Sequence, residues 1–319
     1  MDIINILLVV GGLAIFEIVN SIDNAIINAH VLKTMSVKWR KIFLFWGLIF
    51  AVFVIRGVLP FLIVWITVPG ISIVEAFQAM FSGAPEVVEA INAGKPLILM
   101  GAGVFLLLLY LHWLFLEEKL PLFVVDKLIK PHFGIWFFAC AAVLLTALLY
   151  FAKANPLLML SAAIGNAMFF ILYGFREQAE KGSERLLAGG GGGMGDLSKF
   201  LYLEVLDASF SFDGVLGAFA FTTSIPLILI GNGVGAFVVR EMTIRSIDKV
   251  ANYKFLKNGA MTSIGILGAI IIFESFSESL KLGFDIPDAA APLITFALVG
   301  VAFWESHKLL KKENYAAAG

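Results

Sequence analysis

Five acidic side chains lie inside segments of this 319-residue sequence that are otherwise apolar. They are Glu17, Asp23, Glu204, Asp207 and Asp213. A charged residue at the centre of a membrane helix costs roughly 2.5–3.5 kcal/mol, so such residues usually pair with a cation or line a water-filled path. Amide side chains accompany the acids at Asn20, Asn24 and Asn232. Carboxylate and amide oxygens suit hard divalent ions such as Mn²⁺, Ca²⁺ and Mg²⁺, so these eight residues together predict a metal-cation site.

Two arginines, Arg56 and Arg240, also lie in apolar segments. They can hold helices together through buried ion pairs, or they can orient the carboxylates and occupy the site after the cation leaves. The sequence leaves both roles open. Pairing with two arginines cannot neutralise five acids, which favours a cation site over purely structural ion pairs.

The polar residues of the first acidic segment form a stripe along one helical face. They are Glu17, Asn20, Ser21, Asn24 and Asn28, and they fall within about one third of the circumference. Asp23 lies at the edge of this stripe, next to Asn20. The stripe predicts that one side of this span faces polar neighbours.

The later acidic segment does not fit one regular helix so simply. Glu204 and Asp207 share a face, whereas Asp213 points to the far side of an ideal helix. We therefore expect the helix to unwind or kink between Ser211 and Gly214, because broken helices are tolerated where they line a cavity.

The composition places these segments in a bilayer. Hydrophobic residues make up 60% of the chain and charged residues 15%, with a mean hydropathy of +0.93, whereas a soluble domain is about half apolar and about a quarter charged. One cysteine excludes an intrachain disulfide framework, and four histidines lack the spacing of a zinc site. The net charge of −1 gives no basis for a nucleic-acid partner. Because no P-loop motif is present, we expect no cofactor and coupling to an ion gradient.

We expect an all-α polytopic membrane protein with nine spans of about 20 residues each. The spans lie at about 7–29, 42–68, 97–116, 133–152, 156–175, 199–221, 225–244, 259–277 and 289–305. Loops rich in Lys and Arg alternate along the chain with loops that contain few of these residues. Since cytoplasmic loops carry the excess of basic residues, the pattern predicts a multi-pass protein of the inner (plasma) membrane, with its N-terminus outside and its C-terminus in the cytoplasm.

Two halves of the chain resemble each other. The segments 17–24 (EIVNSIDN) and 207–214 (DASFSFDG) both carry an acid, a serine four residues later and an aspartate two residues after that. The next span of each half carries one arginine, Arg56 or Arg240. The matching spans cross in opposite directions, which predicts an inverted three-plus-three repeat with a site near the bilayer midplane. Shared composition is the alternative, but it does not explain matched acids and arginines.

The chain accordingly divides into six parts. These are a first three-helix repeat, two connecting spans, a Gly-rich cytoplasmic linker, a second three-helix repeat, a final span with its tail, and a short terminal addition of non-native character. Their bounds are 1–116, 117–175, 176–198, 199–280, 281–315 and 316–319.

At these residues the sequence resembles the TerC superfamily of integral membrane proteins, which is grouped with LysE-type transporters. The segment 204–214 is similar to that family's E-x-x-D-x-x-F-x-x-D-S core, with Gly214 in place of the usual serine. Asn232 followed by Arg240 is similar to its N-x7-R element, and the segment 17–24 resembles its E-x4-S-x-DN element.

The resemblance covers about residues 10–120 and 155–278 and indicates a divergent branch, one often labelled as of unknown function. It implies manganese export and metal homeostasis, or membrane assembly as in related plant proteins. Residues and resemblance together predict a secondary transporter of a divalent cation, with Mn²⁺ efflux favoured and protons as the counter-transported ion. A membrane scaffold or assembly factor is the alternative, in which every acid would be paired and no water path would reach it. An enzyme is not expected, because the chain has no evident nucleophile–base pair.

Overall fold

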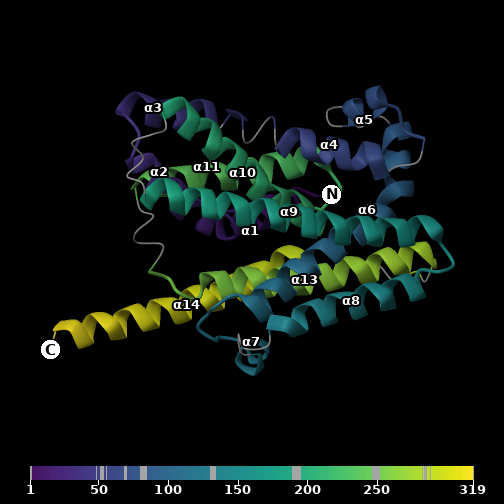
Figure 1. The fold of residues 1–319 in the computed structure, drawn as a ribbon. Coiled ribbons are helices and arrows are strands. Elements are labelled where there is room, and N and C mark those ends of the chain that lie inside the picture. The colour runs from purple at the N-terminus through teal and green to yellow at the C-terminus, as the bar shows by residue number, and fades with distance from the viewer. Residues whose placement is uncertain are drawn as a thin grey trace.

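The structure is a computed structural model that describes residues 2–47, 49–50, 54, 56–67, 70–79, 85–129, 134–188, 195–245, 252–281, 283, 286–287 and 289–318. Within these residues all regular structure is helical, as the sequence predicts. The long helices lie side by side in one bundle, and the C-terminal end of the last helix extends beyond it (Figure 1).

The helices follow one another in the order of their labels. They are α1 (Ile3–Asn20), α2 (Ile22–Lys33), α3 (Val37–Ile42), a π-helical turn (Phe43–Gly47), α4 (Arg56–Thr67), α5 (Ile73–Ala79), α6 (Pro85–Leu116), α7 (Val124–Leu128), α8 (Gly134–Phe151), α9 (Pro156–Ala188), α10 (Asp196–Ala218), α11 (Ile225–Arg245), α13 (Leu256–Ser279) and α14 (Ala290–Ala318).

Seven segments of the described helices are long and apolar enough to cross a membrane, as in multi-pass membrane proteins. They are Ile3–Asn20, Ala93–Leu116, Gly134–Phe151, Pro156–Gln178, Ile225–Thr243, Leu256–Ser279 and Ala290–Glu313. The predicted span 42–68 includes residues outside the described part. The predicted span 199–221 corresponds to α10, which is long enough to cross but carries the buried acids. The count of nine spans therefore stays a prediction.

The first predicted span, 7–29, is not one helix. It is divided into α1 and α2 by a turn at Ser21, whose backbone φ and ψ are −92° and 2°. The Ser21 N–H still donates to the Glu17 carbonyl at 3.0 Å, so the chain bends with little loss of backbone hydrogen bonding. The bend brings α2 against α10 and α11, so the polar stripe of this segment faces two other helices.

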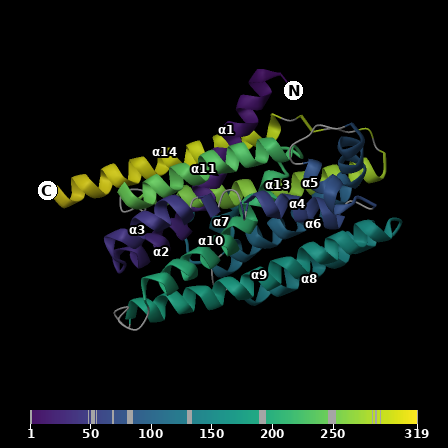
Figure 2. The same cartoon turned by 90° about the horizontal axis from the view of Figure 1, so that it is seen from above.

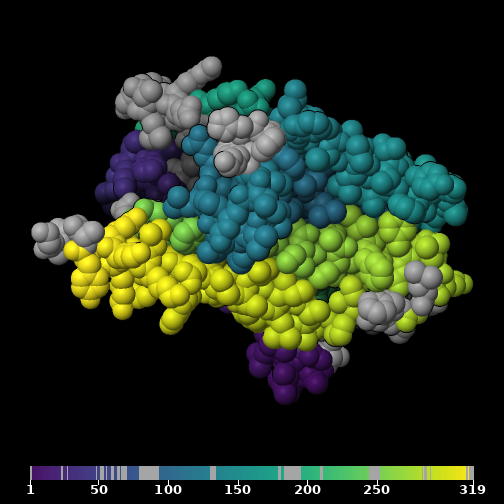
Figure 3. Space-filling view, turned by 90° about the horizontal axis from the view of Figure 1, so that it is seen from below, coloured from purple at the N-terminus to yellow at the C-terminus, as the bar shows by residue number. Residues whose placement is uncertain are grey.

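The apolar core lies between α6 and α13, which pack along much of their length. Its largest fully buried side chains include Phe105 and Trp113 of α6, Phe137 of α8 and Phe16 of α1. Helix α14 lies along α13 on one face of the molecule, while the beginning of α1 projects past them (Figure 2, Figure 3). Helix α1 therefore crosses the bundle obliquely, and its second half lies inside.

Two glycines of α11 let α1 approach closely. A methyl group at Gly231 would lie 2.5 Å from Leu13 Cβ, and one at Gly235 would lie 2.6 Å from Glu17 Cβ and 2.7 Å from the Ala14 carbonyl oxygen. Glycines four residues apart share one helix face, the arrangement that allows close packing of membrane helices. This contact fixes the position of Glu17 within the bundle.

Gly235→Ala is expected to destabilise the protein, because the new methyl group overlaps the backbone of α1. Overpacking of this kind costs about 1–3 kcal/mol, and we expect a lower apparent melting temperature in detergent. Gly174→Ala is the matched control, since a Cβ at Gly174 meets nothing within 4 Å. Equal melting temperatures for the two variants would contradict the close approach of α1 and α11.

The short helix α7 is held against the start of α13 by a buried acid. Asp126 Oδ2 accepts hydrogen bonds from the Leu122 N–H at 3.1 Å and from Asn258 Nδ2 at 2.7 Å. Asn258 Nδ2 also donates to the Leu120 carbonyl at 2.8 Å. Asn258 thus connects the loop before α7 to α13.

Asn258→Ala is expected to lower the free energy of unfolding by about 1–3 kcal/mol, because it removes a donor from a buried carboxylate. Thermal unfolding in detergent measures the effect. Asn252→Ala, at an exposed turn position, serves as the control and is expected to change the melting temperature little. If Asn258→Ala has the same melting temperature as Asn252→Ala, Asn258 does not hold this loop.

Candidate functional site

Polar and charged residues from six parts of the chain meet in a buried group that we call the central cluster. Its members are Glu17, Ser21, Asn24, Asn28, Arg56, Glu204, Asp207 and Arg240. None of them is more than 8% exposed. They come from α1, the turn after it, α2, α4, α10 and α11, so the cluster joins the two halves of the chain.

Ion pairs connect the members of the central cluster. Arg56 pairs with Glu17, and its Nη1 also lies 3.9 Å from Asp207 Oδ2. Arg240 Nη2 lies 3.6 Å from Asp207 Oδ2 and 3.8 Å from Glu204 Oε1. Asp207 therefore stands between the two arginines, and each arginine also faces a second carboxylate. Three acids against two arginines leave the cluster with a formal charge of −1.

Hydrogen bonds hold these side chains in place. Ser21 Oγ donates to Glu17 Oε1 at 2.8 Å, and Asn24 Nδ2 donates to Asp207 Oδ1 at 2.7 Å. Arg240 Nη1 donates to the Phe43 carbonyl at 2.5 Å, and its guanidinium lies 4.2 Å from the centre of the Phe43 ring. The π-helical turn and α2 are thereby attached to α10 and α11.

Several oxygen atoms of the central cluster have no hydrogen-bond partner within the described residues. They are Glu17 Oε2, Asn24 Oδ1, Asn28 Oδ1 and both carboxylate oxygens of Glu204. Glu17, Asn24 and Asn28 also line a cavity of about 20 Å³, a volume that fits a single water or ion. Buried acceptors without donors are uncommon in folded proteins, so these oxygens are available to a cation.

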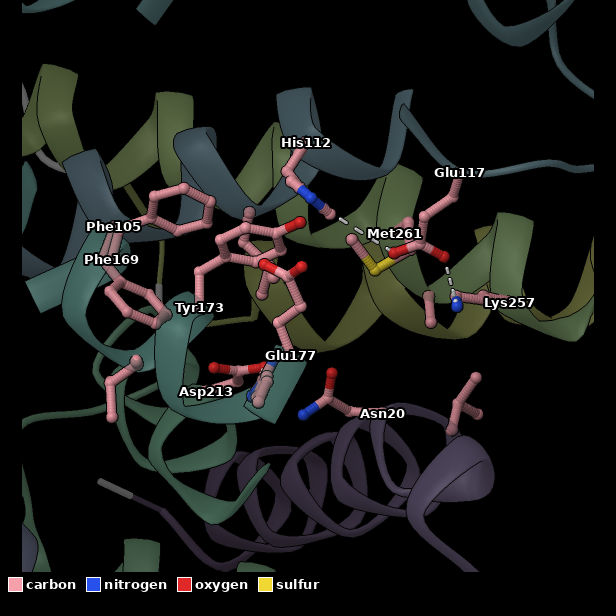
Figure 4. A pocket seen from close by; sticks show the side chains of 15 residues that line it. Asn20, Phe105, His112, Glu117, Phe169, Tyr173, Glu177, Asp213, Lys257 and Met261 are labelled. Atoms are coloured by element: carbon pink, nitrogen blue, oxygen red, sulfur yellow. Dashed lines mark hydrogen bonds and ion pairs between the residues drawn. The ribbon is translucent and has the colours of Figure 1, made fainter. Parts of the chain in front are cut away.

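A second, larger cavity lies beside the central cluster and has a volume of about 340 Å³. We call it the side cavity. Its polar lining consists of Asn20, His112, Glu117, Tyr173, Arg176, Glu177, Asp213 and Lys257. Figure 4 shows the side chains of Asn20, Tyr173, Glu177 and Asp213 directed into this space. Arg176 pairs with Asp213, and Lys257 pairs with Glu117 at 2.5 Å.

The structure divides the predicted site residues between the two places. The central cluster contains Glu17, Asn24, Glu204 and Asp207 together with Arg56 and Arg240. The side cavity contains Asn20 and Asp213. Asn232 is fully buried and donates to the Gly214 carbonyl at 3.4 Å. The side chain of Asp23 lies outside the described residues.

The predicted unwinding of α10 near Asp213 was wrong. Helix α10 is continuous from Asp196 to Ala218, and Asp213 is only 3% exposed. The expectation arose because Asp213 lies opposite Glu204 and Asp207 on a regular helix. The helix stays regular because Arg176 of α9 neutralises Asp213 on that opposite side.

The described acids and histidines do not form a ready-made metal centre. Within the described residues, no group of three or more His, Cys, Asp or Glu side chains is placed to hold a metal ion. A cation in the central cluster would therefore need amide oxygens beside its carboxylates, and it would compete with an arginine for them.

Comparison with known proteins places the chain in a family. The model of the family described as "Protein of unknown function (DUF475)" matches residues 22–313, which is most of the sequence. The chain belongs to the DUF475 family. The resemblance to TerC was therefore wrong: a few acids and arginines at fixed spacing can recur wherever a polar stripe lies within apolar helices. No curated protein and no solved structure matches the sequence significantly.

Arg176 is the residue of this DUF475 protein that the sequence analysis missed. It was placed in the linker 176–198, because the apolar run ends there, but α9 continues to Ala188. Arg176 follows Phe169 and Tyr173 on one helical face, and all three line the side cavity. That spacing is the signal that could have placed it inside the bundle. With Arg176 included, three arginines face four described acids.

Proposed function

We propose that this DUF475 protein transports a divalent metal cation across a membrane and that the central cluster holds the cation in transit. The observation that carries the proposal is the set of buried carboxylate and amide oxygens without hydrogen-bond partners around the small cavity. Oxygen-only ligands favour hard ions. Mn²⁺ is the first candidate, in the direction of efflux, and Ca²⁺ and Mg²⁺ are the alternatives.

The two arginines and a bound cation can alternate as the positively charged partners of the cluster's carboxylates. In the structure Arg56 and Arg240 face the carboxylates that a cation would use. A divalent ion displaces the guanidinium groups from these acids when it binds, and the arginines return when it leaves. Each buried carboxylate then has a cationic neighbour in either state, which avoids the large cost of an isolated buried charge. Proton movement would supply the coupling.

We further propose that this transporter has nine membrane spans, six of which form the inverted three-plus-three repeat. Support comes from matched interactions in the two halves. Ser21 donates to the Glu17 side chain, and Ser211 donates to the Asp207 carbonyl at 2.6 Å. Glu17 pairs with Arg56, and Asp207 lies beside Arg240. The N-terminus would lie outside and the C-terminus in the cytoplasm, as the basic loops indicate.

A membrane scaffold is the second candidate, and one observation favours it. The described acids of the central cluster and Asp213 all have an arginine partner. A scaffold uses such pairs only to join helices, so neutralising them affects stability or assembly and moves no ion.

Mn²⁺ flux in proteoliposomes separates the two candidates. We compare the natural sequence with a Glu17→Gln plus Asp207→Asn double variant, and with Glu305→Gln as a control at an exposed ion pair. The transporter proposal predicts that the monodisperse fraction of the double variant, although less stable, loses at least about tenfold in flux, while the control is unchanged. Absence of flux in the natural protein, under pH gradients of either sign, would favour the scaffold.

A further inference from the structure

The central cluster and the side cavity come close to each other at Gly214. Gly214 follows Asp213 on α10, and its α-carbon faces the Glu17 carboxylate of α1. A methyl group at Gly214 would overlap Glu17 Oε2 and lie 3.6 Å from Glu17 Cδ. Glu17 lines the small cavity of the central cluster, whereas Asp213 lines the side cavity. The Glu17 carboxylate therefore borders both the small cavity and the residue that follows Asp213.

The side cavity is open to solvent at one end. Glu177 and Lys257, which line it, have side chains 48% and 40% exposed. Asp213 lies at the buried end, 3% exposed, and its Oδ1 has no hydrogen-bond partner among the described residues. Asn20 of α1 lies beside it in Figure 4. A buried carboxylate oxygen thus stands at the end of a solvent-accessible space.

The charge and size of the side cavity select its ligand. Glu117, Glu177 and Asp213 stand against Arg176 and Lys257, which gives a formal charge of −1. Such a lining raises the local concentration of cations and disfavours anions. A volume of about 340 Å³ is far larger than a bare ion needs. It suits a divalent ion that keeps most of its water, as Mg²⁺-like ions do.

We propose that the side cavity is a second cation station, which takes a hydrated divalent ion at Asp213 and Asn20. The ion then passes to the central cluster when the Glu17 carboxylate moves off Gly214. This inference rests on the proposed transport function. The cavity lies where the end of α6, the middle of α9 and the start of α13 meet, next to loops expected in the cytoplasm, so it serves as the entrance for efflux.

Gly214→Ala tests the passage without changing any charge. The added methyl group fills the space beside Gly214 that the ion would use once the Glu17 carboxylate has moved, so it narrows the proposed passage. We expect Mn²⁺ flux in proteoliposomes to fall at least about tenfold, while Mn²⁺ binding to the purified variant persists. Gly174→Ala on α9 is the control, because its methyl group meets no neighbour. Flux through Gly214→Ala at the natural rate would overturn the proposed passage.

Thiol labelling tests the station without requiring flux. In a Cys140→Ser background, Asn20→Cys and Asn24→Cys are treated with a positively charged methanethiosulfonate reagent. We expect Asn20→Cys to react at least about tenfold faster than Asn24→Cys, and Mn²⁺ to slow its reaction. Equal rates, or no effect of Mn²⁺ on Asn20→Cys, would overturn the station even if the natural protein transports. Protection by Mn²⁺ without flux would retain the station and reject transport.

Discussion

Replacing Arg240 with glutamine is expected to lower the free energy of unfolding by about 3–5 kcal/mol, the cost of breaking a buried ion pair by removing one partner. Arg240 faces Glu204 and Asp207, donates to the Phe43 carbonyl and stacks on the Phe43 ring. Glutamine keeps part of the hydrogen bonding, but Glu204 loses its arginine partner, and Asp207 is left to share Arg56 with Glu17. The variant is expected to melt well below the natural protein in detergent.

A charge-balanced double variant shows whether the loss comes from electrostatics. Arg240→Gln combined with Glu204→Gln restores the formal charge of −1 and is expected to recover much of the melting temperature. The surface change Lys308→Gln removes a partner from an exposed ion pair and is expected to cost no more than about 1 kcal/mol. If Arg240→Gln and the Arg240→Gln plus Glu204→Gln double variant have the same melting temperature, Arg240 stabilises the protein through its contact with Phe43 and not through its charge.

The sequence predicts the all-helical, apolar character of the chain and the proximity of some central-cluster residues, but it also assigned Asn20 and Asp213 to the same site. A chain this apolar, with polar residues confined to a few segments, must form helices that bury those residues against one another. The proximity of Glu17, Asp207 and Arg240 could be predicted, because a charged side chain exposed to lipid carries a high free-energy cost. Their partners are limited to other intramembrane polar residues, which makes the grouping predictable even though the pairs are far apart in sequence.

The division of the site into two places could not be predicted from spacing. Helical periodicity says which residues share a face, but not which neighbour covers that face. Asp213 faces away from Asp207, and only the position of α9 reveals that Arg176 meets it. The bend at Ser21 was missed for a related reason, because a turn that retains its hydrogen bond to Glu17 leaves little trace in composition.

The glycine at position 214 has a structural role, but not the one that the sequence suggested. The sequence analysis took this glycine as a place where α10 unwinds, whereas α10 remains helical through it. The glycine is required by the close approach of Glu17, since any side chain there would meet the carboxylate. Spacing along one helix contains no information about a contact made by a residue almost two hundred positions earlier.

Arg56→Gln is expected to change cation binding and transport in opposite directions. Removing Arg56 takes the formal charge of the central cluster from −1 to −2 and frees Glu17 from its ion pair. Because two charges about 4 Å apart interact by roughly 4 kcal/mol at an effective dielectric constant of 20, Mn²⁺ should bind at least about tenfold more tightly. Flux should nevertheless fall, because Arg56 is no longer present to replace the departing ion at Glu17.

Arg56→Lys is the matched control for this prediction. It keeps the positive charge while losing the planar geometry of the guanidinium, so we expect an affinity for Mn²⁺ near that of the natural protein and measurable flux. Equilibrium Mn²⁺ binding to purified protein and flux in proteoliposomes are measured on the same preparations. If Arg56→Gln binds Mn²⁺ no more tightly than Arg56→Lys, then Arg56 does not compete with the cation for Glu17. Its ion pair would then serve to hold α4 against α1, as a scaffold requires.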